Sequence, residues 1–212
     1  MSYLSTSKYW HYILYKYIMI TFPLSEREQH AKELFEALLD EQLLCFPTDS
    51  VYWLGGIVTP GVVSRIDACK GRLPGKYYSI IAPDRAWIEA HFVVPKHLPQ
   101  QWQQWYMQHG PITVLLTKKE PNRRSYVSPT PVIGVRRLPH HPIQWLIQAL
   151  WQPVLATSCN RSGVPPIISP DELANDTLLS EHIAYFLTQG TLSGPASTLI
   201  NPQHPENYIK RS

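Results

Sequence analysis

The chain has 212 residues, of which 44% are hydrophobic, 17% charged and 11% aromatic. This length fits one domain or two small ones, and the composition excludes collagen-like, low-complexity and wholly disordered chains. Twenty prolines against ten glycines predict a compact chain with short, ordered connections. The net charge of +3 is compatible with a polyanionic ligand, but it is too small to indicate nucleic-acid binding by itself.

The cysteine pattern and the hydropathy point to a cytoplasmic protein. Cys45, Cys69 and Cys159 cannot all pair and show no C-x-x-C spacing, which favours a reducing compartment over a disulfide scaffold. No apolar run reaches the roughly 18 residues of a membrane span. We therefore expect no membrane partner.

The N-terminal segment does not show the pattern of a domain element that the rest of the chain shows. Its aromatic, apolar stretch is interrupted by Lys16, and no signal-peptide cleavage site follows. We expect residues 1–24 to be an extension, disordered or preceding a true start at Met19. Residues 25–205 are then expected to form one domain.

Taken in chain order, the first predicted element is a helix over 26–41, because Ser25 and Glu28 form a capping box before apolar positions at helical spacing. Further helices are expected to begin near Pro60, Asp84, Leu98, Pro142 and Ser169. Strands are expected at 43–46, 77–82, 112–117, 132–136, 154–157 and 197–200. Because strands and helices alternate irregularly, we expect an α/β (α+β) fold, a single domain with a twisted mixed β-sheet flanked by helices.

Two segments resemble functional motifs, a phosphate-binding loop and a metal-binding histidine pair, but do not fit them. The segment 71–76 imitates a phosphate-binding P-loop but is one residue short, and Tyr77 replaces the Ser or Thr that binds magnesium. His140 and His141 are adjacent, so their side chains diverge, which favours an N-cap or surface role over a metal ligand. No metal site on the protein is predicted.

Three segments carry candidate chemistry. Residues 46–55 place Thr48 and Ser50 just after a strand, where ligands of α/β sheets bind, although turn chemistry alone explains these residue types. Lys70 and Arg72 flank Gly71 at a predicted helix end, where they could converge on one anion or simply complement the helix dipole.

The third segment, residues 156–163, follows a strand and supplies three hydroxyls and an amide without a full charge. Arg136 also ends a predicted strand and could pair with a carboxylate. Ser197 adds a hydroxyl at the start of the last predicted strand.

Together and in this order, Phe-Pro-Thr-Asp-Ser-Val-Tyr, Lys-Gly-Arg, Gly-Pro-Ile-Thr, Gly-Val-Arg, Thr-Ser-Cys-Asn-x-Ser-Gly and Pro-Ala-Ser-Thr resemble the YrdC/TsaC family of L-threonylcarbamoyladenylate synthases. The resemblance implies a YrdC/RibB-like fold and a nucleotidyltransferase of the short bacterial form. Such enzymes condense L-threonine, bicarbonate and ATP, with Mg²⁺, to threonylcarbamoyl-AMP and pyrophosphate. Their product feeds the N6-threonylcarbamoyl modification of adenosine 37 in tRNA through separate transferase-complex proteins, which are the implied partners.

The resemblance also implies roles for individual residues. The family motifs assign catalysis to Lys70 and Arg72, and ATP binding to Lys70, Arg72, Ser158 and Asn160. They assign threonine binding to Thr48, Ser50, Tyr52, Arg136, Ala156 through its backbone, and Ser197.

One departure from the family pattern leaves alternatives open. Trp53 stands where the family usually has glycine, and a tryptophan would be untenable there if the position needed a positive φ. One alternative is therefore a catalytically impaired relative that binds RNA, weakly, through basic clusters at 118–119, 123–124 and 136–137. A further alternative is carbamoyl-adenylate chemistry for another acceptor, as in the YrdC-like domains of hydrogenase maturation proteins.

Overall fold

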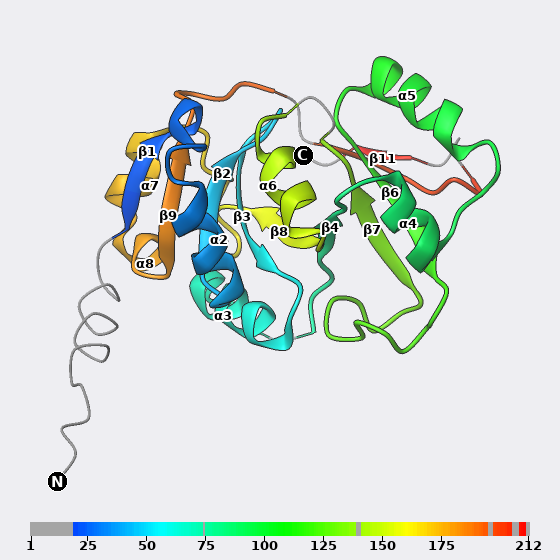
Figure 1. The fold of residues 1–212 in the computed structure, drawn as a ribbon, viewed down its shortest axis with the longest axis horizontal. Coiled ribbons are helices and arrows are strands. Elements are labelled where there is room, and N and C mark those ends of the chain that lie inside the picture. Colours follow the sequence, from blue (N-terminus) through cyan, green and yellow to red (C-terminus); the bar gives the residue numbers. More distant parts are fainter. Residues whose placement is uncertain (1–18, 74, 139–140, 195–196, 205–207, 211–212) are drawn as a thin grey trace, which may run out of the picture.

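The computed structural model describes residues 19–73, 75–138, 141–194, 197–204 and 208–210. They build one mixed, twisted sheet (Figure 1), which confirms the expected fold class. Along the sheet the strands follow the order β1 (Ile20–Pro23), β9 (Ile183–Thr188), β2 (Leu43–Pro47), β3 (Tyr52–Ile57), β8 (Val154–Ser158), β4 (Ser79–Ile81), β7 (Val132–Arg136), β6 (Ile112–Lys118), β10 (Thr198–Ile200) and β11 (Ile209–Lys210), with β5 (Phe92–Val93) also paired to β6.

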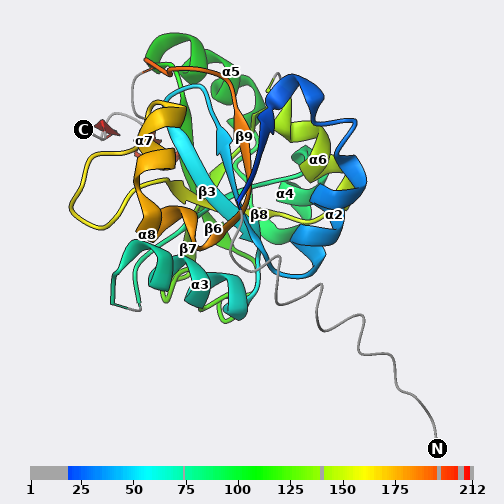
Figure 2. The same cartoon turned by 90° about the vertical axis from the view of Figure 1, so that its left-hand side faces the viewer.

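Helices cover both faces of this sheet. They are the 3-10 helix η2 (Leu24–Glu26) and the α-helices α2 (Ala31–Leu39), α3 (Pro60–Lys70), α4 (Arg85–His91), α5 (Leu98–His109), α6 (Ile143–Leu150), α7 (Pro170–Asn175) and α8 (Thr177–Ser180). Figure 2 shows α2 and α6 on one side of the central strands and α7 and α8 on the other. Helix α3 contacts α8, β2 and β3, so it belongs to the second layer.

The start of the domain differs from the sequence expectation. Strand β1 pairs in parallel with β9, so the sheet begins at residue 20 rather than at residue 25. The helix expected over 26–41 begins only at Ala31, after η2, and its N-cap His30 makes no side-chain cap bond. The ring of Phe22 stacks on that of His30, with centroids 4.1 Å apart, and this contact requires the chain to turn between them. Residues 1–18 lie outside the described residues.

The sequence analysis missed strand β3, which it treated as a loop. This strand contains Gly55 and Gly56, whose low strand propensity hides it. Packing explains both glycines. A Cβ at Gly55 would lie 2.5 Å from the carbonyl oxygen of Leu155, and one at Gly56 would lie 3.0 Å from the Val62 side chain. Strand β3 therefore fits only because these two positions carry no side chain.

Helix α3 has the ends that the sequence predicts. The Oγ1 of Thr59 accepts a hydrogen bond from the Val62 amide at 3.1 Å, and Pro60 occupies the first turn. Gly71 ends the helix in the left-handed conformation, with φ of 59°. The termination places Lys70 inside the last turn and Arg72 just beyond it, on a chain that has changed direction.

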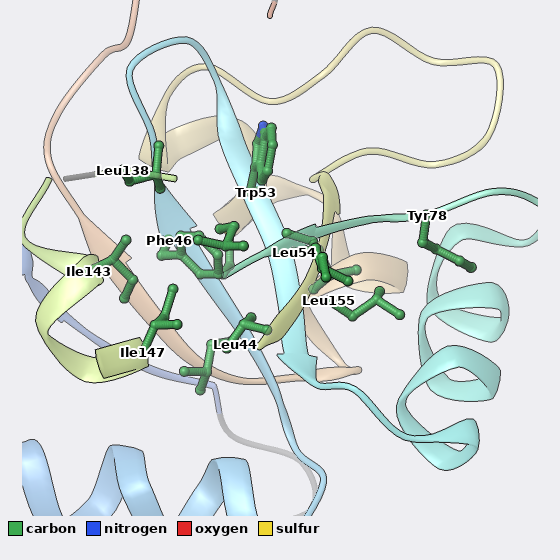
Figure 3. Close-up of a cluster of buried hydrophobic side chains, with 14 of the residues drawn as sticks. Leu44, Phe46, Trp53, Leu54, Tyr78, Leu138, Ile143, Ile147 and Leu155 are labelled. Carbon is green, nitrogen blue, oxygen red and sulfur yellow. The ribbon is translucent and has the colours of Figure 1, made fainter. Parts of the chain in front are cut away.

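The core lies between β2, β3, β8 and helix α6. Figure 3 shows Ile143 and Ile147 of α6 pointing toward Leu44 and Phe46 of β2. All four side chains are at most 2% exposed. Each contributes on the order of 1.5–3 kcal/mol through burial. This packing fixes the strands whose ends carry the candidate residues.

Candidate functional site

Strand register places several candidate residues on one face of the sheet. Residues directly opposite one another in neighbouring strands point to the same face. Trp53 of β3 lies opposite Ser158 of β8. Ala156 lies opposite Ser79 of β4, and Ser79 opposite Gly134 of β7. Because side chains alternate along a strand, this face also includes Arg136, two residues beyond Gly134.

Lys70 holds the segment that follows β8. Its Nζ donates hydrogen bonds to the Ser158 carbonyl at 2.5 Å, the Asn160 carbonyl at 2.9 Å and Asn160 Oδ1 at 2.9 Å. The Oγ of Ser158 also donates to Asn160 Oδ1, at 2.6 Å. Burial, and then the nearby Arg72, lower the pKa of Lys70 to about 8, so the ammonium is still charged at pH 7. The structure thus brings together three of the four residues predicted to bind ATP.

Arg72, the fourth of these residues, is held by a different cluster. Its Nε donates to Asp67 Oδ1 at 3.0 Å and to the Tyr78 hydroxyl at 3.2 Å, and its guanidinium lies 4.3 Å from the centre of the Tyr78 ring. The Tyr78 hydroxyl donates to the same Asp67 carboxylate. Burial and this contact raise the pKa of Tyr78 to about 12. Arg72 Nη2 is buried and has no hydrogen-bond partner among the described residues, so it can serve an incoming anion.

The loop after β2 presents two buried hydroxyls. Thr48 Oγ1 lies 3.2 Å from Ser50 Oγ and donates to the Val51 carbonyl at 2.8 Å. The Ser50 amide donates back to Thr48 Oγ1 at 3.3 Å. These bonds are those of a hydroxyl-stabilised turn, as the simpler interpretation of this segment predicts.

Between those two hydroxyls, Asp49 forms an ion pair with Arg136. The Nη2 of Arg136 donates to Asp49 Oδ1, and the guanidinium lies 4.4 Å from the centre of the Trp53 ring. Trp53 is 4% exposed and sits in regular strand β3, without a positive φ. The tryptophan is therefore compatible with the backbone and forms one wall of the arginine site.

Two further side chains lie near this pair: Tyr106, which the sequence analysis missed, and His141, for which it expected an N-cap or surface role. The Tyr106 hydroxyl, from α5, lies beside Asp49, and burial together with that carboxylate raises the pKa of Tyr106. His141 Nδ1 accepts a hydrogen bond from the Ile143 amide at 3.2 Å, which is a capping contact at the start of α6. Burial lowers the pKa of His141 to about 4, so this ring is neutral at pH 7. No local pattern near Tyr106 indicates its proximity to Asp49, because α5 is distant in sequence.

The segment 189–194 packs against the loop after β2 and the start of β3. Ser197 Oγ lies 3.2 Å from Thr113 Oγ1 on β6. A Cβ at Gly194 would lie 1.9 Å from the Asp49 carbonyl oxygen, so only glycine permits this approach. Tyr52 donates to the Gly190 carbonyl at 2.7 Å and accepts from the Gln189 amide at 2.9 Å. Strand alternation turns Tyr52 to the face opposite Trp53, so it anchors this segment from behind.

A cavity of about 590 Å³ lies beside the Arg72 cluster. Tyr78 belongs to both, because it carries the Arg72 guanidinium on its ring and lines the cavity. Hydroxyl and amide groups of Ser79, Thr117, Ser128 and Asn201 contribute polar edges to a largely apolar wall. A cavity of this volume, with polar groups on an apolar wall, can hold a small organic ligand.

The basic clusters considered for RNA binding are largely engaged within the protein. Lys118 is buried and donates to the Ser128 carbonyl, and Lys119 donates to the Glu89 carbonyl. Arg123 pairs with Glu120, and Arg124 lies over the Trp87 ring. Arg136 is occupied as described above. These contacts give the RNA-binding interpretation no structural support.

Within the described ranges, no three His, Cys, Asp or Glu side chains converge as metal ligands. No described helix has the length and apolarity to cross a bilayer. Cys45, Cys69 and Cys159 are free and buried, and burial raises the pKa of Cys69 to about 12.

A model of the Sua5/YciO/YrdC domain, described as "Telomere recombination", matches residues 36–212. The chain belongs to the Sua5/YciO/YrdC family. It is 32% identical over 138 residues to threonylcarbamoyl-AMP synthase of Pyrococcus abyssi, covering 64% of this chain and 40% of the relative. It is 27% identical over 142 residues to threonylcarbamoyl-AMP synthase of Serratia proteamaculans, covering 66% and 75%.

The crystal structure of P. abyssi Sua5 complexed with L-threonine superimposes with a TM-score of 0.72 at 26% identity, covering 88% of this chain and 54% of that one. The chain thus spans about half of the solved Sua5 chain and 40% of its curated Pyrococcus relative. Membership of this Sua5/YciO/YrdC family confirms the resemblance drawn from the sequence motifs.

Proposed function

We propose that the protein is an L-threonylcarbamoyladenylate synthase, a nucleotidyltransferase that condenses L-threonine, bicarbonate and ATP. The observation that carries the proposal is the placement of buried or half-buried cations next to the end of β8. Lys70 contacts Ser158 and Asn160, with Arg72 two residues further along the chain, and Arg136 lies over Trp53, which is paired with Ser158. A reaction between two anions needs such neutralisation, because the carbamate and the triphosphate otherwise repel each other. The relatives named threonylcarbamoyl-AMP synthase support the same reaction.

The proposed ATP site joins the Lys70 cluster to the neighbouring cavity. Arg72 would donate from Nη2 to phosphate oxygens, while Lys70 supplies positive charge and holds Ser158 and Asn160 in place. The cavity bordered by Tyr78 would receive the nucleoside. Magnesium would arrive with the triphosphate, since the described residues do not converge as a metal site.

The proposed threonine site lies around Arg136. Its guanidinium would bind the substrate carboxylate, and the hydroxyls of Thr48, Ser50 and Ser197 would bind polar groups of the amino acid. Ala156 would contribute through its backbone. Tyr52 would act from behind the sheet, by anchoring segment 189–194 rather than by touching the substrate.

The chemistry requires positioning and charge neutralisation more than a covalent nucleophile. The neutral threonine amine attacks carbon dioxide and releases a proton, or attacks bicarbonate and releases water, to form a carbamate. A carbamate oxygen then attacks the α-phosphorus of ATP, the bond to the β-phosphate oxygen breaks, and pyrophosphate leaves. We place this activity in the cytoplasm, upstream of the tRNA threonylcarbamoyl-transferase proteins.

Pyrophosphate release from ATP tests the proposal. We expect release only when L-threonine and bicarbonate are both present, and we expect Lys70→Ala and Arg72→Ala to reduce it strongly. Cys159→Ala serves as the matched control, since Cys159 lies between Ser158 and Asn160 but its thiol is buried against that of Cys45. Absence of release with all three substrates, together with salt-sensitive RNA affinity, would instead favour the impaired RNA-binding relative.

A further inference from the structure

Asp49 and Arg136 form an ion pair whose members differ in exposure. The Arg136 side chain is 1% exposed, whereas the Asp49 side chain keeps 22% of its surface exposed. Neutralising a buried guanidinium requires a carboxylate in contact with it, but it does not require that carboxylate to reach solvent. The exposed part of Asp49 is therefore accessible to a ligand that enters the site.

The groups around the pair leave its charges balanced. The Trp53 ring lies against the guanidinium, and the Tyr106 hydroxyl lies beside the carboxylate. His141 also faces the pair, and burial lowers its pKa to about 4, so it adds no charge at pH 7. Arg27, a further cation near His141, is paired with Glu28 at 3.0 Å.

An amino acid carries the complementary pattern of charges. Its ammonium and carboxylate groups are attached to the same carbon, so it presents opposite charges a few ångströms apart. A guanidinium and a carboxylate that lie in contact offer one positive and one negative charge at a similar spacing. The guanidinium can then bind the substrate carboxylate, and the protein carboxylate can bind the substrate ammonium. Arg136 alone would accept any carboxylate, including that of an acid without an amino group.

We propose that Asp49 binds the α-ammonium group of the amino-acid substrate while Arg136 binds its α-carboxylate. The pair then recognises the zwitterion and rejects acids that lack an amino group. The inference rests on the proposed function, because it assigns a specificity residue to the same threonine site. The turn made by Thr48 and Ser50 fixes Asp49 between two hydroxyls, which holds the carboxylate against Arg136.

Isothermal titration calorimetry with two ligands tests this assignment. The ligands are L-threonine and 3-hydroxybutanoate, which is threonine without its amino group. We expect the wild-type protein to bind L-threonine at least tenfold more tightly than the analogue. We expect Asp49→Asn to weaken L-threonine binding at least tenfold, about 1.4 kcal/mol, while its affinity for the analogue stays within twofold or improves. Asp49→Glu, which keeps the charge, should retain part of the preference.

Asp40→Asn is the matched control, since it removes the same charge from an exposed position at the end of α2. Equal weakening of both ligands in Asp49→Asn would overturn the inference, because Asp49 would then only support Arg136. Unchanged or tighter threonine binding in that variant would overturn it as well, because Asp49 would be a competitor for Arg136.

Two outcomes separate this inference from the proposed function. If the wild-type protein bound no L-threonine, the proposed function itself would fail. If it bound L-threonine and 3-hydroxybutanoate equally well, the proposed function would stand and the role of Asp49 alone would be refuted. This wild-type comparison needs no variant, so it holds even if Asp49→Asn does not fold.

Discussion

We expect the ammonium of Lys70 to make ATP affinity sensitive to pH between pH 7 and pH 9. The ordinary pKa of a lysine is 10.5, and burial and Arg72 lower that of Lys70 to about 8. The group is therefore about 90% protonated at pH 7 and about 10% protonated at pH 9. Arginine guanidinium groups keep their charge throughout this range.

If only the protonated lysine supports triphosphate binding, the apparent Kd for ATP rises about tenfold between pH 7 and pH 9. The loss follows the folded-state pKa, so affinity is intact below pH 7 and falls as the pH passes about 8. Isothermal titration calorimetry of ATP at pH 7, 8 and 9 measures this change.

The control for this experiment is Lys70→Met, which keeps the apolar stem and removes the charge. We expect the variant to bind ATP more weakly at pH 7 and to show no tenfold change up to pH 9. A wild-type affinity that varied less than twofold, or the same pH dependence in Lys70→Met, would refute the role assigned to this ammonium.

Further predictions concern packing around the site. Tyr52→Phe removes the hydroxyl that contacts Gly190 and Gln189, so we expect the free energy of unfolding to fall by about 1–2 kcal/mol in urea titrations and the KM for threonine to rise. Gly194→Ala would place a Cβ 1.9 Å from the Asp49 carbonyl, and we expect a loss of about 1–3 kcal/mol by the same titration; an unchanged midpoint would contradict the close packing. Trp53→Ala should cost about 3–5 kcal/mol, and near wild-type stability would show that the indole is not part of the core.

The elements with strong local signals were predictable from the sequence. The Thr59-Pro60 start and Gly71 end of α3 were predicted and confirmed, because capping and glycine termination depend on neighbouring residues alone. The Asp84 cap of α4 is confirmed in the same way, with its Oδ1 accepting from the Trp87 amide at 2.7 Å. Strand β3 was missed, since its glycines follow from packing against Leu155 of β8, which is far away in sequence, and against Val62 of the next helix, which only the fold brings into contact.

The sequence motifs predicted which residues belong to the candidate site, but not which side chains those residues contact. The motifs named Lys70, Ser158 and Asn160, yet only the fold places a side chain from the end of α3 against the segment after β8. Asp49 and Tyr106 were not singled out, because nothing near them in the sequence indicates that β7 and α5 lie beside the loop after β2. Long-range pairing of this kind depends on strand order, which local patterns do not encode.

The most direct test of the account is identification of the product. The purified protein would be incubated with ATP, L-threonine, magnesium and carbon-13 bicarbonate, and the adenylates formed would be analysed by mass spectrometry. The account predicts a threonylcarbamoyl-AMP that carries one carbon-13 atom, which disappears when threonine is omitted or when Arg136 is replaced by alanine. An ATP that remains intact, or an adenylate that contains threonine without the labelled carbon, would contradict it.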